Sequence, residues 1–123
     1  DLKRFASEFN NHHYLFIPWH LTKNDASRFA QQAGGHLVSL NGRNEEIFVN
    51  RLSENRTDFW VDCYGDEENM HWRHGKESGH LIDGIKRDWG LPWFYKTKEY
   101  RLSNFSRVQY EVDIHEFVIE WEN

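Results

Sequence analysis

The sequence predicts an α+β domain, because helical periodicity is confined to its first half and short strand-like runs fill its second half. Two amphipathic segments, at 22–33 and from 41 or 42 to 52, have the apolar spacing of helices. Strand-like runs follow at 59–64, 70–73, 100–102, 108–112 and 117–121. A chain of 123 residues is enough for one core and leaves little room for a second, so we expect a single domain over 1–123.

The first half begins with a strand and a capped helix. Residues 13–17 favour a strand, and Pro18 is expected to end it, because proline cannot donate to a sheet. Thr22, with Asp25 three residues later, is a helix-capping signal, and either glycine of 34–35 supplies the stop. The apolar positions between these signals recur at helical spacing: Ala26, Phe29, Ala30 and Ala33.

A second helix is expected to begin near Asn41 or Gly42, with Glu45 and Glu46 close to the positive end of its dipole. Its buried stripe is predicted to consist of Ile47, Phe48 and Leu52. Further along, residues 74–99 carry five glycines or prolines and few alternating runs, which predicts a long irregular loop region. Long loops in compact domains are usually functional.

Composition argues against several classes of function. The formal net charge of −5 disfavours a general affinity for nucleic acid, which requires a basic face. No apolar run approaches the roughly 20 residues of a membrane-spanning helix, so we expect no membrane insertion. Cys63 is the lone cysteine and has no internal disulfide partner, which favours a reducing compartment or a prokaryotic origin. Because the chain starts at Asp1 without an initiator Met, we expect a processed product or, as the main expectation, a domain excised from a larger, multidomain protein.

Four motifs resemble, in order and spacing, those of the C-type lectin-like domain family. They are Ala33-Gly34-Gly35-His36-Leu37-Val38-Ser39-Leu40, Phe59-Trp60-Val61-Asp62-Cys63, Trp72-Arg73-His74-Gly75 and Phe117-Val118-Ile119-Glu120-Trp121. Residues 34–37 match the family's Gly-Gly-His-Leu, and 60–63 match its Trp-Ile-Gly-Leu strand, with Asp62 in place of the glycine. A Glu-rich helix with a buried Phe is matched by Glu45, Glu46 and Phe48. The resemblance runs from about Tyr14 to Glu122.

This resemblance implies a C-type lectin-like fold, in which two helices pack on small antiparallel sheets beside a long irregular loop region. It also implies a recognition domain, since members of the family usually bind ligands and do no chemistry. The family is usually extracellular, in contrast to what the cystine-free sequence favours.

The family's disulfides are missing from this chain. The positions of one cystine fall on Ala30 and Ile119, so we expect an apolar contact there between the first helix and the last strand. Tyr110 takes one position of the second cystine. Cys63 replaces a leucine of the family motif and is expected to be a buried apolar plug.

The calcium site of the family's sugar-binding members is also missing. Their Glu-Pro-Asn or Gln-Pro-Asp loop is matched best by Leu91-Pro92-Trp93, which has no oxygen-bearing side chain beside the proline. Their Trp-Asn-Asp motif aligns with Phe105-Ser106-Arg107, which places a cation where calcium would lie. Calcium takes about six to eight oxygen ligands, so the sequence predicts calcium-independent recognition.

The ligand-binding residues predicted for the loop region are four bulky aromatics and one arginine: Trp89, Trp93, Phe94, Tyr95 and Arg107. Tryptophan, tyrosine and arginine dominate interaction hot spots. The alternative is that Trp89 and one neighbour pin the loop to the core.

No catalytic or metal site is predicted. His71, His74 and His80 share no helical face and have no evident fourth ligand, so we interpret them as scattered surface histidines. The Asp66-Glu67-Glu68 run is interpreted as a solvated hairpin tip rather than a cation site. No nucleophile has a base at a recognisable spacing and no phosphate loop is present, so we expect neither enzymatic activity nor a cofactor.

Three functional hypotheses follow. The first is a calcium-independent recognition module that contacts a protein or a glycan through residues 76–99. The second is a structural or spacer domain without a ligand, and the third is a weak carbohydrate binder that uses tryptophan stacking. An exposed patch of Trp93, Phe94 and Arg107 would favour recognition, whereas burial of these residues would favour the spacer.

Overall fold

The computed structural model describes residues 1–40, 42–54, 59–65, 70–80 and 114–122. Its elements, in chain order, are the 3-10 helix η1 (Leu2–Phe5), β1 (Ser7–Phe9), β2 (His12–Leu21), α1 (Lys23–Gln32), β3 (His36–Leu37), α2 (Arg43–Leu52), β4 (Cys63–Gly65), β5 (Met70–Trp72) and β6 (His115–Trp121). Within these residues, two α-helices and two antiparallel sheets confirm the α+β prediction.

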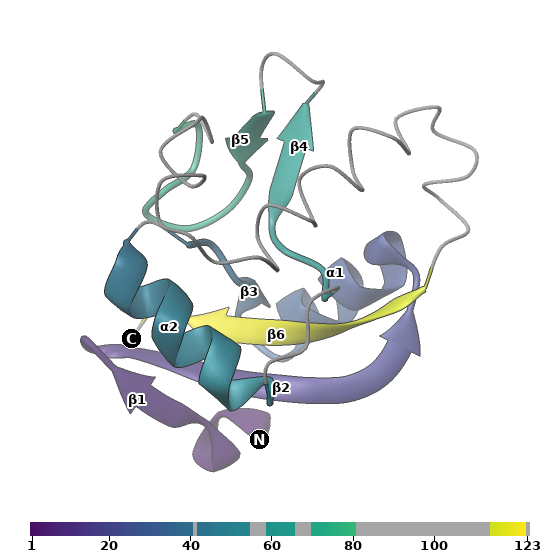
Figure 1. Ribbon diagram of the computed structural model, residues 1–123. Coiled ribbons are helices and arrows are strands. Elements are labelled where there is room, and N and C mark those ends of the chain that lie inside the picture. Colours follow the sequence, from purple (N-terminus) through teal and green to yellow (C-terminus); the bar gives the residue numbers. More distant parts are fainter. Residues whose placement is uncertain (41, 55–58, 66–69, 81–113, 123) are drawn as a thin grey trace.

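The main sheet has four strands in the order β1-β2-β6-β3, all paired antiparallel. β6 lies between β2 and β3, so the end of the chain inserts into a sheet built by its beginning (Figure 1). β1 and β2 form a hairpin whose two turn residues, Asn10 and Asn11, have φ values of 58° and 69°. The sequence pattern predicts neither β1 nor η1.

The expectation that Pro18 ends the first strand is wrong. β2 continues to Leu21, and its register against β6 shifts between Ile17 and Leu21. Residues 18–20 are exposed where this irregularity occurs. A residue at a bulge makes no hydrogen bond to the neighbouring strand. The strand therefore tolerates Pro18, which has no N–H to donate.

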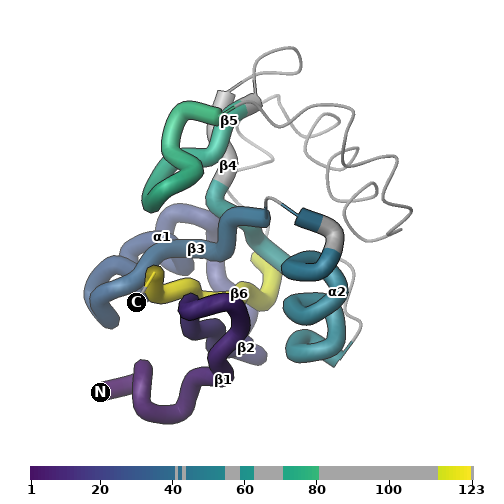
Figure 2. Tube along the Cα trace, turned by 90° about the vertical axis from the view of Figure 1, so that its left-hand side faces the viewer, coloured from purple at the N-terminus to yellow at the C-terminus, as the bar shows by residue number. Residues whose placement is uncertain are grey.

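The two helices cover opposite faces of the main sheet, α2 on one side and α1 on the other (Figures 1 and 2). The Thr22 side chain accepts a hydrogen bond from the Asp25 N–H at 3.2 Å and caps α1, as predicted. At the other end, Gly34 has a φ of 92°, and the N–H groups of Gly34 and Gly35 donate to carbonyls of the last turn. The glycine pair is therefore the helix stop, which is also confirmed.

α2 begins after Gly42, as expected, but its buried side is more polar than predicted. Glu45 and Glu46 are 8% and 0% exposed, because the first turn of the helix faces the sheet rather than solvent. Val49 is fully buried on the same side. The predicted stripe is only partly buried: Ile47, Phe48 and Leu52.

Two apolar clusters fill the space between the helices and the main sheet. The cluster on the α1 side includes Ala30 and Ile119, both 0% exposed, together with Trp60 and Phe117. The prediction that the first helix and the last strand meet in apolar contact is thus confirmed. The cluster on the α2 side includes Tyr14, Val38, Leu40, Val49, Phe59, Val61, Trp72 and Val118.

β4 and β5 form a separate two-stranded sheet, in which Cys63 pairs with Trp72. The strand predicted at 59–64 is shorter than expected, because Trp60 makes only an isolated bridge before β4 begins. Residues 74–80, the described part of the predicted loop region, form turns and carry one isolated bridge, between Ser78 and Trp72. The predicted hairpin tip, the strands at 100–102 and 108–112, Tyr110 and the Cys63 side chain lie outside the described part of the chain.

Candidate functional site

A row of polar side chains crosses the face of the main sheet that α2 covers. The odd-numbered residues of 117–121 belong to the apolar cluster against α1, so the even-numbered ones face the opposite side. Glu120 pairs in the sheet with Tyr14 of β2 and with His36 of β3. Directly paired residues share a face, and all three side chains are buried. The centre of this sheet face is therefore built around a carboxyl group.

Glu120 is the middle group of this row. Its Oε1 accepts a hydrogen bond from the Ser39 N–H at 3.0 Å, and its Oε2 lies 2.6 Å from His12 Nδ1. Burial raises the pKa of Glu120 to about 9, although the bond from Ser39 lowers it. Three further carboxyl groups raise this pKa by repulsion: those of Glu45, Glu122 and Asp62. At a separation of 2.6 Å, Glu120 Oε2 and His12 Nδ1 share one hydrogen bond.

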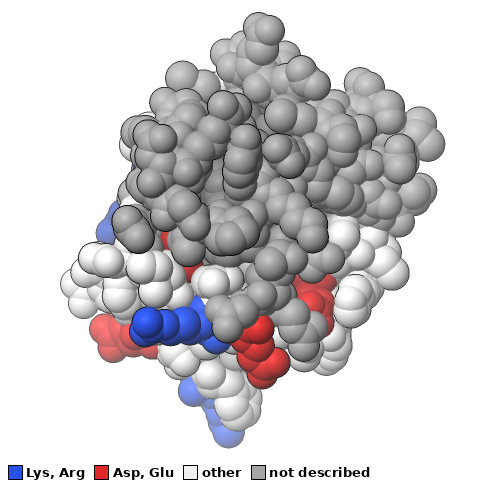
Figure 3. Space-filling view, viewed as in Figure 1, with Lys and Arg blue, Asp and Glu red and all other residues white. Residues whose placement is uncertain are grey.

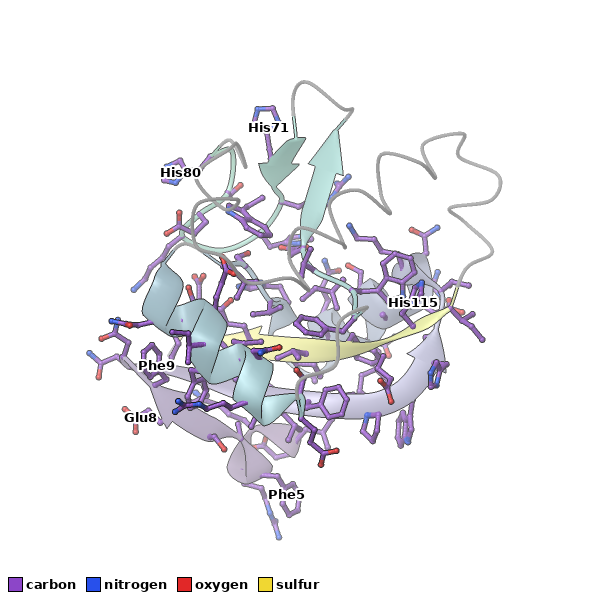
Figure 4. The ribbon with its side chains drawn as sticks, viewed as in Figure 1. Phe5, Glu8, Phe9, His71, His80 and His115 are labelled. Carbon is purple, nitrogen blue, oxygen red and sulfur yellow. The ribbon has the colours of Figure 1, made fainter. Side chains whose placement is uncertain are left out.

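Tyr14 connects the row to α2. Its hydroxyl donates a short hydrogen bond to Glu45 Oε2, and its ring packs edge-on against Phe48 with a centroid distance of 5.4 Å. Burial, followed by repulsion from Glu120 and Glu45, raises the pKa of the Tyr14 hydroxyl above its ordinary value, so that this group stays a donor. Phe9, labelled in Figure 4 beside α2, stacks on Phe48 at 4.8 Å and ties β1 to the same helix.

On the other side of Glu120, a histidine meets the end of β6. The side chain of His36 is 10% exposed, and its Nδ1–H donates to the Leu37 carbonyl at 2.6 Å. Its Nε2 lies 3.3 Å from Glu122 Oε2. Glu122 Oε1 accepts a hydrogen bond from the Lys76 N–H at 2.8 Å. Through these contacts, β3, the end of β6 and the turn after β5 meet at one point.

His74 belongs to this neighbourhood, and its interpretation as a scattered surface histidine is wrong. Its N–H donates to Asp62 Oδ2 at 2.8 Å, and its Nδ1 lies 3.0 Å from Asp62 Oδ1. Asp62 is 1% exposed, so the acid that replaces the family glycine is buried and has the partly exposed His74 as its partner. His71 and His80 point outward, away from β6, as Figure 4 shows.

The geometry offers two places for a cation among the described residues. One group consists of His12, Glu45 and Glu120, and the other of His36, Glu120 and Glu122. Within each group, one ligand atom per residue lies within 4.8 Å of the others. A pocket of about 430 Å³ opens beside the first group, against His12 and Glu45, and extends to the backbone turn at residues 76–77.

The predicted ligand-binding residues Trp89, Trp93, Phe94, Tyr95 and Arg107 all lie outside the described residues, as does the expected calcium position at 88–107. Neither recognition through the loop nor the alternative of a pinned Trp89 is therefore tested by the structure. Within the described residues, the large apolar side chains that are exposed are Phe5, Trp19 and Ile114.

Sequence reasoning missed the polar row because it assigned no partner to Glu120, Glu122 or His36. One signal in the sequence points to the row. Glu120 and Glu122 alternate with apolar residues in a strand whose other face is apolar, so both occupy the face opposite to Trp121. His36 lies in the strand expected to follow the glycine stop, and only sheet order, which is a tertiary property, brings it beside Glu120.

The surface of the described residues mixes both charges. On the face drawn in Figure 3, Lys and Arg side chains lie next to Asp and Glu side chains rather than in a separate basic area. Over the part of the chain that the structure describes, no helix combines the length and the apolar character needed to cross a membrane.

Comparison with known proteins gives structural similarity without sequence similarity. No protein-family model and no curated protein matches the chain. Among solved structures, human lithostathine superposes with a TM-score of 0.63 at 20% identity, covering 96% of this chain and 88% of its own. The carbohydrate-recognition domain of the mouse scavenger receptor C-type lectin gives 0.61 at 18% identity, covering 96% and 95%. SPL-1, solved in complex with GlcNAc, gives 0.62 at 14% identity, covering 95% and 92%.

These superpositions cover nearly the whole length of each partner, at identities where only the fold is comparable. Together with the two helices on a small antiparallel sheet, they show that this chain has a C-type lectin-like fold.

Proposed function

We propose that the chain is a non-catalytic recognition module that binds a protein or glycan partner through the loop region 76–99 and Arg107, without calcium. The observation that carries this proposal is how the chain distributes its aromatic side chains. Within the described residues, Trp60, Trp72 and Phe117 are at most 2% exposed and pack in the core. The run 89–95 adds two more tryptophans, a phenylalanine and a tyrosine in a glycine-containing stretch. Loops on a rigid scaffold are where binding residues concentrate.

Calcium independence is supported by the residues at the expected ligand positions. Leu91 and Trp93 flank the proline, and Ser106 and Arg107 stand in the second motif, so this set offers at most one hydroxyl oxygen from a side chain. A hard cation with about six to eight oxygen ligands would not be held there.

The absence of catalysis is supported by the engagement of the buried acids and bases with one another. Glu120 and His12 share one hydrogen bond, and Asp62 and His74 share another. A general base must reach a substrate proton at hydrogen-bond distance, and these groups already direct their polar atoms at each other.

The proposal is tested on an array of glycans that includes GlcNAc-terminated structures, probed with the wild-type chain and with a Trp93→Ala/Arg107→Ala double variant. We expect the wild type to bind equally with calcium and with EDTA, and the double variant to lose binding. Trp19→Ala is the matched control, since Trp19 is 56% exposed and lies on β2, outside the loop region. Binding that EDTA abolishes and added calcium restores would contradict the proposal.

Two other results would also distinguish between the functional hypotheses. Unchanged binding by the double variant, with loss in Trp19→Ala, would move the site to the bulge of β2. If no glycan binds, binding to a protein partner is tested by crosslinking the protein in its native cells and comparing the crosslinked partners of the wild type and the double variant. A partner that crosslinks to the wild type but not to the double variant supports recognition. Identical sets of crosslinked partners favour the hypothesis of a structural or spacer domain.

A further inference from the structure

We propose that His36, Glu120 and Glu122 form a binding site for a divalent transition ion of the zinc class, where β3 meets the end of β6. His36 is the cross-strand partner of Glu120, and Glu122 follows two residues later, directly after β6 ends. Their ligand atoms lie within 4.8 Å of one another. This proposal does not depend on the proposed recognition function.

The backbone contact of the His36 ring fixes which nitrogen can bind an ion. Nδ1 lies 2.6 Å from the Leu37 carbonyl oxygen. A carbonyl oxygen only accepts hydrogen bonds, so Nδ1 carries a proton, and Nε2 is the nitrogen whose lone pair can bind an ion. Metal-binding histidines have this arrangement, with one ring N–H held by a carbonyl or carboxylate and the other nitrogen facing the ion.

The atoms facing each other have the separation of two ligands of one ion. His36 Nε2 and Glu122 Oε2 are 3.3 Å apart. Two ligands bound tetrahedrally to zinc at about 2.0–2.1 Å lie about 3.3 Å from each other. Among the described residues, neither atom has a hydrogen-bond partner, and both are buried. A nitrogen lone pair opposite a carboxylate oxygen is repulsive unless a proton or a cation lies between them.

The orientation of Glu122 is also fixed. Its Oε1 accepts the Lys76 N–H at 2.8 Å, which leaves Oε2 directed at His36. Gly75 packs against this pair, because a Cβ at that position would come within 2.6 Å of His36 Nε2 and closer still to Glu122 Oε2. With a φ of 79°, Gly75 makes an approach that a residue with a side chain would not make without strain.

The second histidine–carboxylate group fits an ion less well. His12 Nδ1 and Glu120 Oε2 are 2.6 Å apart, which is a hydrogen-bond distance and too short for two ligands of one ion. In the His36 group, Glu120 would supply a third ligand, and water would complete the tetrahedron. A ligand set of imidazole nitrogen and carboxylate oxygen suits zinc and its neighbours in the transition series rather than calcium.

The test is calorimetric titration of the folded chain with zinc chloride, in a buffer that does not bind metal. We expect one zinc per chain, and we expect Glu122→Gln to weaken zinc binding by about 100-fold or more, since even outer-shell changes weaken such sites by about 10–100-fold. The glutamine can still accept from Lys76, and its amide N–H can donate to His36 Nε2, so this variant folds without the ion. Zinc should raise the Tm of the wild type by mass action and leave that of Glu122→Gln unchanged.

His80→Gln is the control, because His80 is exposed and its ring contacts Glu77, outside the proposed ligand set. Binding within about threefold of the wild type is expected for this control. The proposal is overturned if the wild type takes up no zinc at millimolar concentration, if Glu122→Gln binds as the wild type does, or if His80→Gln loses binding to the same extent as Glu122→Gln. Cobalt gives a second readout, in which a thiolate-to-metal absorption band would place Cys63 among the ligands and refute this ligand set.

Discussion

An engineered disulfide between residues 30 and 119 offers a direct test of the packing at the centre of this fold. Both Ala30 and Ile119 are fully buried in the cluster between α1 and β6. The double variant Ala30→Cys/Ile119→Cys should therefore form a cystine on oxidation. The wild type contains only Cys63, so reductant should leave its stability unchanged.

The expected magnitude follows from the length of the closed loop and the volume lost at Ile119. A cross-link that closes about 90 residues lowers the entropy of the unfolded chain by the equivalent of about 4.6 kcal/mol. Replacing isoleucine by cysteine in a filled core costs about 2 kcal/mol. The oxidised variant should thus be about 2–3 kcal/mol more stable than the wild type, and the reduced variant about 2 kcal/mol less stable.

The measurement is urea unfolding of the wild type and of the variant in oxidising and reducing buffer, with peptide mass spectrometry to identify the linked cysteines. The most direct measure of the cross-link is the difference in unfolding free energy between the oxidised and the reduced variant, since the two states share one sequence. If both new thiols stay free in the folded protein under oxidising conditions, or if oxidation lowers stability, then α1 and β6 do not meet as described here.

Three further changes test local features. Thr22→Ala should destabilise the domain by about 1 kcal/mol, because the Asp25 N–H loses its cap, whereas Thr22→Ser should be neutral; urea midpoints give both values. Gly35→Ala should cost about 1–3 kcal/mol, because its Cβ would lie 2.5 Å from the Glu120 carbonyl oxygen, while Gly42→Ala, with nothing within 4 Å, should cost less than about 1 kcal/mol. With EDTA present, Glu120→Gln should flatten the pH dependence of stability. The pKa of Glu120 rises from 4.5 to about 9 on folding, so its stabilising contribution is complete below pH 4.5 and is lost towards pH 9, by roughly 1 kcal/mol per unit. Equal slopes for the wild type and Glu120→Gln in urea unfolding at pH 5, 6, 7 and 8 would refute this assignment.

Local signals predicted the parts of the fold that local chemistry decides. The capping of α1 by Thr22 and its stop at Gly34 depend on backbone groups within a few residues, and the sequence pattern places both correctly. β1 was missed because a strand of three residues is defined by its partner rather than by its own pattern. The usable signal was the Asn10-Asn11 pair, since asparagine tolerates the positive φ of both central residues in a tight hairpin turn.

The candidate site was predicted less well, for a physical reason. A glutamate in a sequence is assigned to solvent unless a partner is known, and the partners of Glu120 come from β2, β3 and the segment after it. Sheet order alone brings these groups together, so no window of sequence contains the information. The family resemblance gave the fold, but it directed attention to the calcium position and away from this face.

β6 links the two parts of the molecule that the proposals concern. Shortly before the segment 81–113, the Lys76 N–H donates a hydrogen bond to Glu122, which directly follows the end of β6. It returns at His115, the first residue of β6, whose ring packs edge-on against Trp60 at 4.8 Å. Residues 115 and 122 are about 23 Å apart along an extended strand.

Because β6 is buried on both faces, a slip by one residue would replace Phe117, Ile119 and Trp121 on the α1 side by Val118 and two glutamates. The strand is therefore fixed in register, and the separation of the two attachment points is fixed with it. An ion between His36 and Glu122 would strengthen one of these attachment points. The fixed register of β6 supports the proposal that the sheet supplies stability and that residues 76–99 supply recognition.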